Sequence, residues 1–136
     1  MSLASVSGWI ATSLMIGAAV VPVAQRLLRG KRAELGSASV TMHFLIGLTA
    51  AGLGFLHPLT AVFALGSPEA VGGGVLALGF GGLAFVVLLA HTGLGLKLRD
   101  PKLKKRPSSR RAHVATAVTI LLLVGAHVVA CLTGGE

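Results

Sequence analysis

Four long apolar segments alternate with short polar segments along this chain of 136 residues. The apolar segments cover residues 7–28, 40–65, 68–98 and 109–132, and hydrophobic residues make up 54% of the sequence. A helix of about 20 apolar residues crosses the hydrocarbon core of a bilayer, so each segment is long enough to span a membrane. The pattern predicts an all-α membrane protein in which residues 1–136 form a single four-helix transmembrane bundle.

The polar segments contain signals for helix starts. Ser37 and Ser39 are suited to cap the second helix. Ser67 stands as an N-cap residue before Pro68 and Glu69, which are typical of a first helical turn. These residues predict that the third helix begins at about Pro68 or Val71.

The positive charge is confined to two places. All twelve Lys and Arg residues lie in or beside the polar segments after the first and third helices. With four spans these two loops lie on the same side, and the positive-inside rule places them in the cytoplasm and both termini outside. The net charge of +8 therefore reports topology rather than nucleic-acid binding. Size and charge bias favour a bacterial inner membrane, in contact with membrane lipid.

The second and fourth helices each carry two histidines with the same spacing of two heptads: His43 and His57, and His113 and His127. This spacing brings both rings of a helix to one face and places them about 21 Å apart along it. The two helices run in the same direction, which brings His43 to the level of His113 and His57 to the level of His127. Four ionisable side chains inside membrane spans indicate a functional site.

Two matched histidine pairs predict axial ligands of two haem irons, with His43 and His113 on the cytoplasmic side and His57 and His127 on the outer side. Cys131 is the only cysteine, so a Cys-x-x-Cys-His attachment site is absent and the haems are expected to be non-covalent b-type haems. Zinc or copper sites usually need ligands clustered at one depth with carboxylates or thiolates nearby. A metal-ion or proton pathway remains the alternative interpretation of the four histidines.

Small residues fill the face between the two histidines of the second helix, at Gly47, Ala50 and Gly54. This stripe leaves room for a flat macrocycle, or it serves close packing of helices.

A fifth histidine, His91, lies in the third helix near the cytoplasmic level. We expect it to act near the inner haem rather than as an axial ligand, by hydrogen bonding to a propionate or by lining a small polar cavity. A simple bond to a backbone carbonyl is the competing interpretation. Arg110 and Arg111 stand beside His113 and are candidates for propionate contacts, although positive-inside bias also accounts for them.

The paired histidines on two parallel helices, with Gly47 between His43 and His57 and two arginines before His113, resemble the ferric-reductase-like transmembrane domain of ferric reductases and NADPH oxidases. They also resemble small di-haem membrane cytochromes b. The resemblance implies that the four histidines ligate two haems and that electrons cross the membrane through them. Members of that family usually add a cytosolic flavin and nicotinamide domain, and this sequence has no Gly-rich nucleotide fingerprint.

The sequence therefore predicts transmembrane electron transfer by a di-haem cytochrome b, with a separate electron donor and acceptor protein or a quinone as partners. Side-chain catalysis is not expected, because no acid–base pair or nucleophile arrangement occurs. The alternative is a haem-bearing membrane-anchor subunit of a quinol-linked oxidoreductase complex, with His91 and Thr92 near a quinone head group. A haem-free transporter or scaffold is a third hypothesis. A homodimer is compatible with so small a unit.

Overall fold

The computed structural model describes residues 2–63 and 73–134, which form four helices. The helices are α1 (Leu3–Arg29), α2 (Ala38–Phe63), α3 (Gly74–Leu98) and α4 (Arg106–Thr133). Each is long and apolar enough to cross a membrane, which confirms the predicted all-helical protein with four candidate spans. The predicted cap of the third helix at Ser67 to Glu69 lies outside the described residues.

Local signals explain where the helices begin and end. Helix α1 starts earlier than predicted, at Leu3, because the side chain of Ser2 accepts a hydrogen bond from the backbone N–H of Ser5 at 3.2 Å. It ends at Gly30, whose φ of 65° is in the left-handed region that favours glycine. Ser37 accepts from Val40 N at 3.4 Å, as expected of a cap. Ser39 instead donates to Gln25 Oε1 of α1 at 2.7 Å and so ties two helices together.

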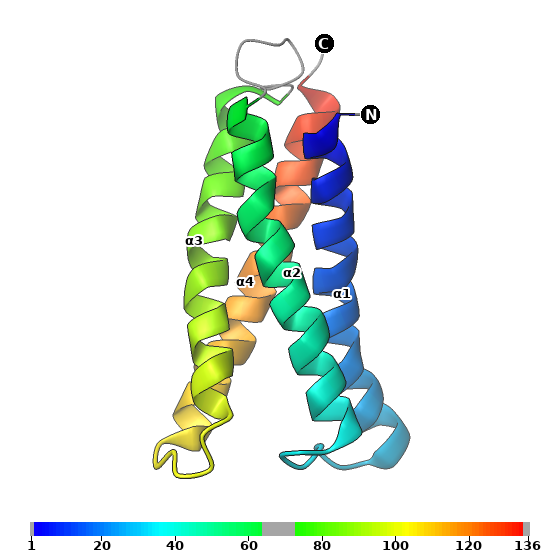
Figure 1. The fold of residues 1–136 in the computed structure, drawn as a ribbon, viewed down its shortest axis with the longest axis vertical. Coiled ribbons are helices and arrows are strands. Elements are labelled where there is room, and N and C mark those ends of the chain that lie inside the picture. The colour runs from blue at the N-terminus through cyan, green and yellow to red at the C-terminus, as the bar shows by residue number, and fades with distance from the viewer. Residues whose placement is uncertain (1, 64–72, 135–136) are drawn as a thin grey trace.

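The helices pack as two antiparallel hairpins, α1 with α2 and α3 with α4, and most helix–helix contacts lie within these hairpins. Figure 1 shows the hairpins side by side in an elongated bundle, with residues 30–37 and 99–105 at one end and both termini at the other. The first is called the basic end and the second the terminal end. The hairpins diverge toward the basic end (Figure 1).

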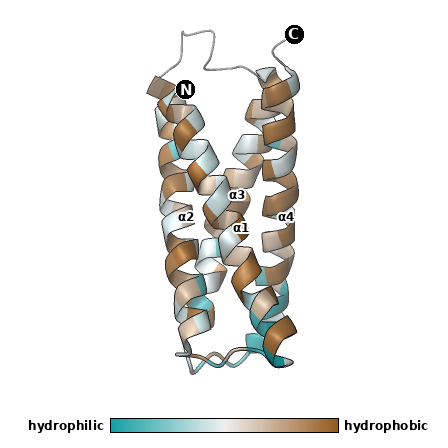
Figure 2. Cartoon of the chain, turned by 90° about the vertical axis from the view of Figure 1, so that its right-hand side faces the viewer, coloured by the Kyte–Doolittle hydropathy of each residue, from teal (hydrophilic) through white to brown (hydrophobic). Residues whose placement is uncertain are grey.

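Most of the buried apolar side chains in the described residues are alanines, whereas many large apolar side chains are exposed. Figure 2 shows hydrophobic residues along all four helices and hydrophilic residues gathered at the basic end. This distribution is typical of helices that pack through small residues while their outer faces contact lipid tails. The buried apolar residues are Ala11, Ala18, Ala50, Ala77, Ala84, Leu88 and Ile120.

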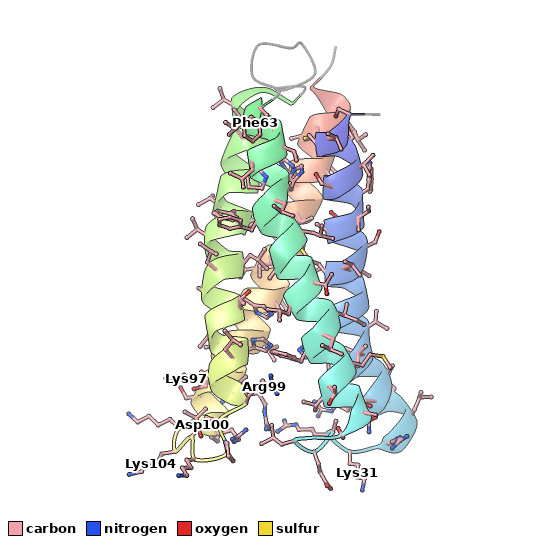
Figure 3. The ribbon with its side chains drawn as sticks, in the orientation of Figure 1. Lys31, Phe63, Lys97, Arg99, Asp100 and Lys104 are labelled. Carbon is pink, nitrogen blue, oxygen red and sulfur yellow. The ribbon has the colours of Figure 1, made fainter. Side chains whose placement is uncertain are left out.

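Charged side chains gather at the basic end, where Lys31, Lys97, Asp100 and Lys104 extend away from the helices (Figure 3). Arg99 differs from them, because its guanidinium lies 4.1 Å from the centre of the Phe44 ring on α2. This cation–π contact joins the two hairpins close to the basic end.

Candidate functional site

Helices α2 and α4 bring their histidines together in two pairs. The ring centres of His43 and His113 are 6.0 Å apart toward the basic end, and those of His57 and His127 are 6.1 Å apart toward the terminal end. The two pairs are called the basic-end level and the terminal-end level. They are the same pairs that the two-heptad spacing and the parallel helices predict.

The separation within each pair suits two ligands on opposite sides of one metal centre. A metal ion about 2 Å from one nitrogen of each ring would hold the ring centres roughly 6 Å apart. The ring planes are steeply inclined, by 88° in the pair of His43 and by 74° in the pair of His57. Among the described residues, no group of three or more His, Cys, Asp or Glu side chains is arranged to hold a metal ion. Each pair therefore offers two imidazoles to a metal centre.

Three of the four paired rings are fixed by a hydrogen bond from Nδ1 to a backbone carbonyl of the other helix in the same hairpin. An imidazole whose Nδ1–H is bound in this way presents the lone pair of Nε2, and this is how metal-ligating histidines are usually oriented. The three bonds are His43 Nδ1 to Ala18 O at 2.8 Å, His57 Nδ1 to Ala4 O at 3.1 Å, and His127 Nδ1 to Ala77 O at 2.8 Å.

Hydroxyl groups reinforce one of these bonds. Ser7 Oγ lies 3.2 Å from His57 Nδ1 and 3.0 Å from Ala4 O, so it shares both partners of that hydrogen bond. Thr60 Oγ1 donates to the His57 carbonyl at 2.7 Å and lies 3.3 Å from Ser7 Oγ. The His57 ring is therefore held by both helices of its hairpin.

Glycines provide the surface against which three rings lie. A Cβ atom added to Gly8 would be 3.0 Å from His57 Cε1, and one added to Gly81 would be 3.0 Å from His127 Nδ1. At Gly95 the nearest atom is His113 Cε1 at 3.3 Å. These positions take no larger side chain unless a ring moves.

The ring of His91 stacks on that of His113, with centres 3.9 Å apart and planes inclined by 13°. The structure thus brings the fifth histidine to the basic-end level. His91 Nδ1 lies 2.9 Å from Thr116 Oγ1 on α4. His113 Nδ1 is buried and has no hydrogen-bond partner in residues 2–63 and 73–134.

The predicted propionate contacts at Arg110 and Arg111 are solvent-exposed side chains in the first turns of α4. Arg99, which the sequence did not single out, is the cation that lies against the turn of α2 containing His43. Its position depends on the chain reversal between α3 and α4, which the sequence pattern does not specify.

The small-residue stripe of α2 has different surroundings along its length. A Cβ added to Gly54 would be 2.7 Å from Leu88 Cδ2, so a leucine of α3 already fills the space there. No heavy atom lies within 4 Å of a Cβ added to Gly47, nearer the basic end. Two hollows, of about 210 and 160 Å³, lie at the basic end among loop residues and the neighbouring ends of helices, and no histidine lines them.

The carbonyl positions that fix the rings were missed in the sequence, although an internal repeat marks them. Ala4, Gly8 and Ala11 of α1 recur with the same spacing in α3 as Ala77, Gly81 and Ala84. The histidine pair of α2 likewise recurs with its spacing unchanged in α4. The two hairpins therefore share an Ala-Gly-Ala spacing on the first helix and a histidine pair on the second.

Comparisons with models of protein families, with curated proteins and with solved structures give no match for this chain.

Proposed function

We propose that this protein transfers electrons across a membrane through two b-type haems. His43 and His113 are the axial ligands of one haem, and His57 and His127 are those of the other. The observation that carries the proposal is the pair of ring separations, 6.0 and 6.1 Å, at two depths of a membrane-length bundle. The carbonyl bonds of His43, His57 and His127 support it, because they engage Nδ1 and leave Nε2 as the nitrogen that could bind iron. Beside His127, the Cys131 thiol lies 3.9 Å from Nε2 and would have to turn away.

Haem iron supplies the one-electron redox chemistry when it is bound. The chain's part is to hold the ligands, separate the two levels and exclude water. Two histidines that are two heptads apart place the levels about 21 Å apart along the helices. This separation matches the need to carry an electron across most of a hydrocarbon core about 30 Å thick.

The basic end faces the cytoplasm in this proposal, and both termini face outward, as in the inner membrane of a bacterium. The charge supports this orientation, because all twelve Lys and Arg residues lie in or beside the loops of that end. The haem of His43 and His113 then exchanges electrons with a cytoplasmic partner.

Single cysteines introduced in a Cys131→Ala background test the orientation. We expect Ala33→Cys and Lys104→Cys, one in each basic loop, to resist a membrane-impermeant maleimide in intact cells and to react after permeabilisation. Ser2→Cys, at the terminal end, should react in both conditions. The opposite pattern would invert the orientation, and different behaviour of the two loops would contradict four spans.

A pyridine haemochrome assay on the detergent-purified full chain tests the function, together with a dithionite-reduced spectrum. About two b-type haems per chain are expected, one for each histidine pair. Purified protein without a Soret band would overturn the proposal and favour a haem-free transporter or scaffold. Reduction of the haems by a quinol analogue without any added protein would instead place the chain in a quinol-linked complex.

A further inference from the structure

The four carbonyl positions in the repeated hairpins are not identical. Three of them are alanines, Ala4, Ala18 and Ala77, and the fourth is His91, which follows Ala77 at the same spacing by which Ala18 follows Ala4. His113 Nδ1, the nitrogen that corresponds to the bonded one in the other three rings, is buried and has no hydrogen-bond partner among the described residues. His113 is thus the one ring of the four that lacks a carbonyl bond among the described residues, and it is also the ring on which His91 stacks.

Thr116 completes this difference between the hairpins. Thr116 is the third residue after His113, and the corresponding third residue after His43 is Ile46. A hydroxyl group therefore replaces an aliphatic side chain at this position of α4. The Thr116 hydroxyl donates one hydrogen bond that is shared between the carbonyl oxygens of Ala112 and His113. Each of these oxygens lies 3.0 Å from Oγ1. Its lone pair then accepts the Nδ1–H of His91 at 2.9 Å, which fixes the tautomer and the plane of the His91 ring.

We infer that His91 is a positioning residue for His113, and that its stacked imidazole makes the two haem levels inequivalent. This inference rests on the proposed function. The stack on His91 holds the ring of His113 nearly perpendicular to that of His43. The other three rings are held by a hydrogen bond to a backbone carbonyl instead. His91 does not share an iron with His113, because rings stacked 3.9 Å apart and inclined by only 13° cannot bind opposite sides of one metal ion.

The same geometry has an electronic consequence. A carbonyl bond at Nδ1 makes an imidazole a more basic ligand, and His113 lacks that bond. The two histidine pairs would therefore hold iron at different reduction potentials.

The test uses EPR spectra and redox titration of the purified haem-loaded protein, because the largest g value of ferric bis-imidazole haem depends on the angle between the two ring planes. His91→Ala recreates the residue found at the three other carbonyl positions, so we expect it to fold and to keep about two haems. In His91→Ala, one EPR signal and one midpoint potential should change. They should be the signal and the potential that His113→Ala loses. His91→Phe retains a stacked ring and should restore the wild-type signal.

Thr116→Val removes the acceptor of His91 Nδ1 and should shift the same signal in the same direction. Thr119→Val is its matched control, because Thr119 lies one turn further along α4 and bonds only to Ala115 O of its own helix. Unchanged signals in both His91→Ala and Thr116→Val would overturn the inference while leaving the haem assignment intact. Loss of one haem in His91→Phe would make His91 a ligand, and wild-type protein without haem would overturn both proposals.

Discussion

Alanine at His57 or at His113 is expected to leave about one b-type haem per chain in either variant, because each substitution removes one axial ligand from a single level. The other level keeps both of its rings, and the two levels are separated by about 21 Å of helix. The haemochrome assay measures the content, and EPR shows which signal is lost. The two single variants should lose different signals.

Double variants test the pairing as well as the ligands. His43→Ala with His113→Ala removes both ligands of one level, so about one haem should remain. His57→Ala with His113→Ala damages both levels and should leave almost none. Loss of both haems in both double variants would pair the rings within a helix instead of between α2 and α4, and the opposite result would pair His57 with His113.

Matched controls separate ligation from a general effect of substitution in these helices. Thr49→Val on α2 and Thr119→Val on α4 each remove an exposed hydroxyl that bonds only to a carbonyl of its own helix. Both should keep about two haems. Full haem retention in His57→Ala and His113→Ala would contradict the ligand assignment.

The four spans and the two histidine levels follow from simple periodicities, which explains why the sequence predicts them. Apolar runs of membrane length specify helices because a bilayer leaves backbone groups no partner except their own helix. Four spans with short loops make α2 and α4 parallel, and equal two-heptad spacings then align His43 with His113 and His57 with His127. Neither step depends on side-chain packing.

The orientation of each ring depends on how the helices of a hairpin are rotated against each other, and the spacing of histidines does not contain this information. Ala18 and Ala77 act through their backbone carbonyls, which every residue has, so nothing in their residue type marks them as partners of His43 and His127. For Ala77, but not for Ala18, the recurrence of the Ala-x3-Gly-x2-Ala pattern of α1 carries a signal. Alignment of the first half of the chain with the second would have found it.

The role of His91 was predicted only in outline for a similar reason. Its position in the third helix gives its depth, which is why the sequence associates it with the level of His113. Whether it reaches a propionate, a cavity or another ring depends on the distance between α3 and α4. Gly95 allows that distance to be short, because its missing side chain leaves His113 Cε1 only 3.3 Å from where a Cβ would stand.

Valine in place of Gly81 should remove the haem of the terminal-end level although it changes no ligand. The Cβ would stand 3.0 Å from His127 Nδ1 and 3.1 Å from Cε1, so the ring has to move away from α3. That movement should weaken the 2.8 Å bond to Ala77 O and shift the His127 ring relative to that of His57. We expect about one haem per chain by the haemochrome assay, with the EPR spectrum of His57→Ala.

Gly79→Val is the matched control on the same helix. Gly79 is exposed and no heavy atom lies within 4 Å of its added Cβ, so the same valine should leave both haems in place. Gly81→Ala should give an intermediate occupancy, because a single methyl displaces the ring less than the branched side chain does. Equal haem content in Gly81→Val and Gly79→Val would show that His127 does not need its contact with α3. The carbonyl bonds would then be by-products of helix packing rather than the means by which this fold aims its histidines.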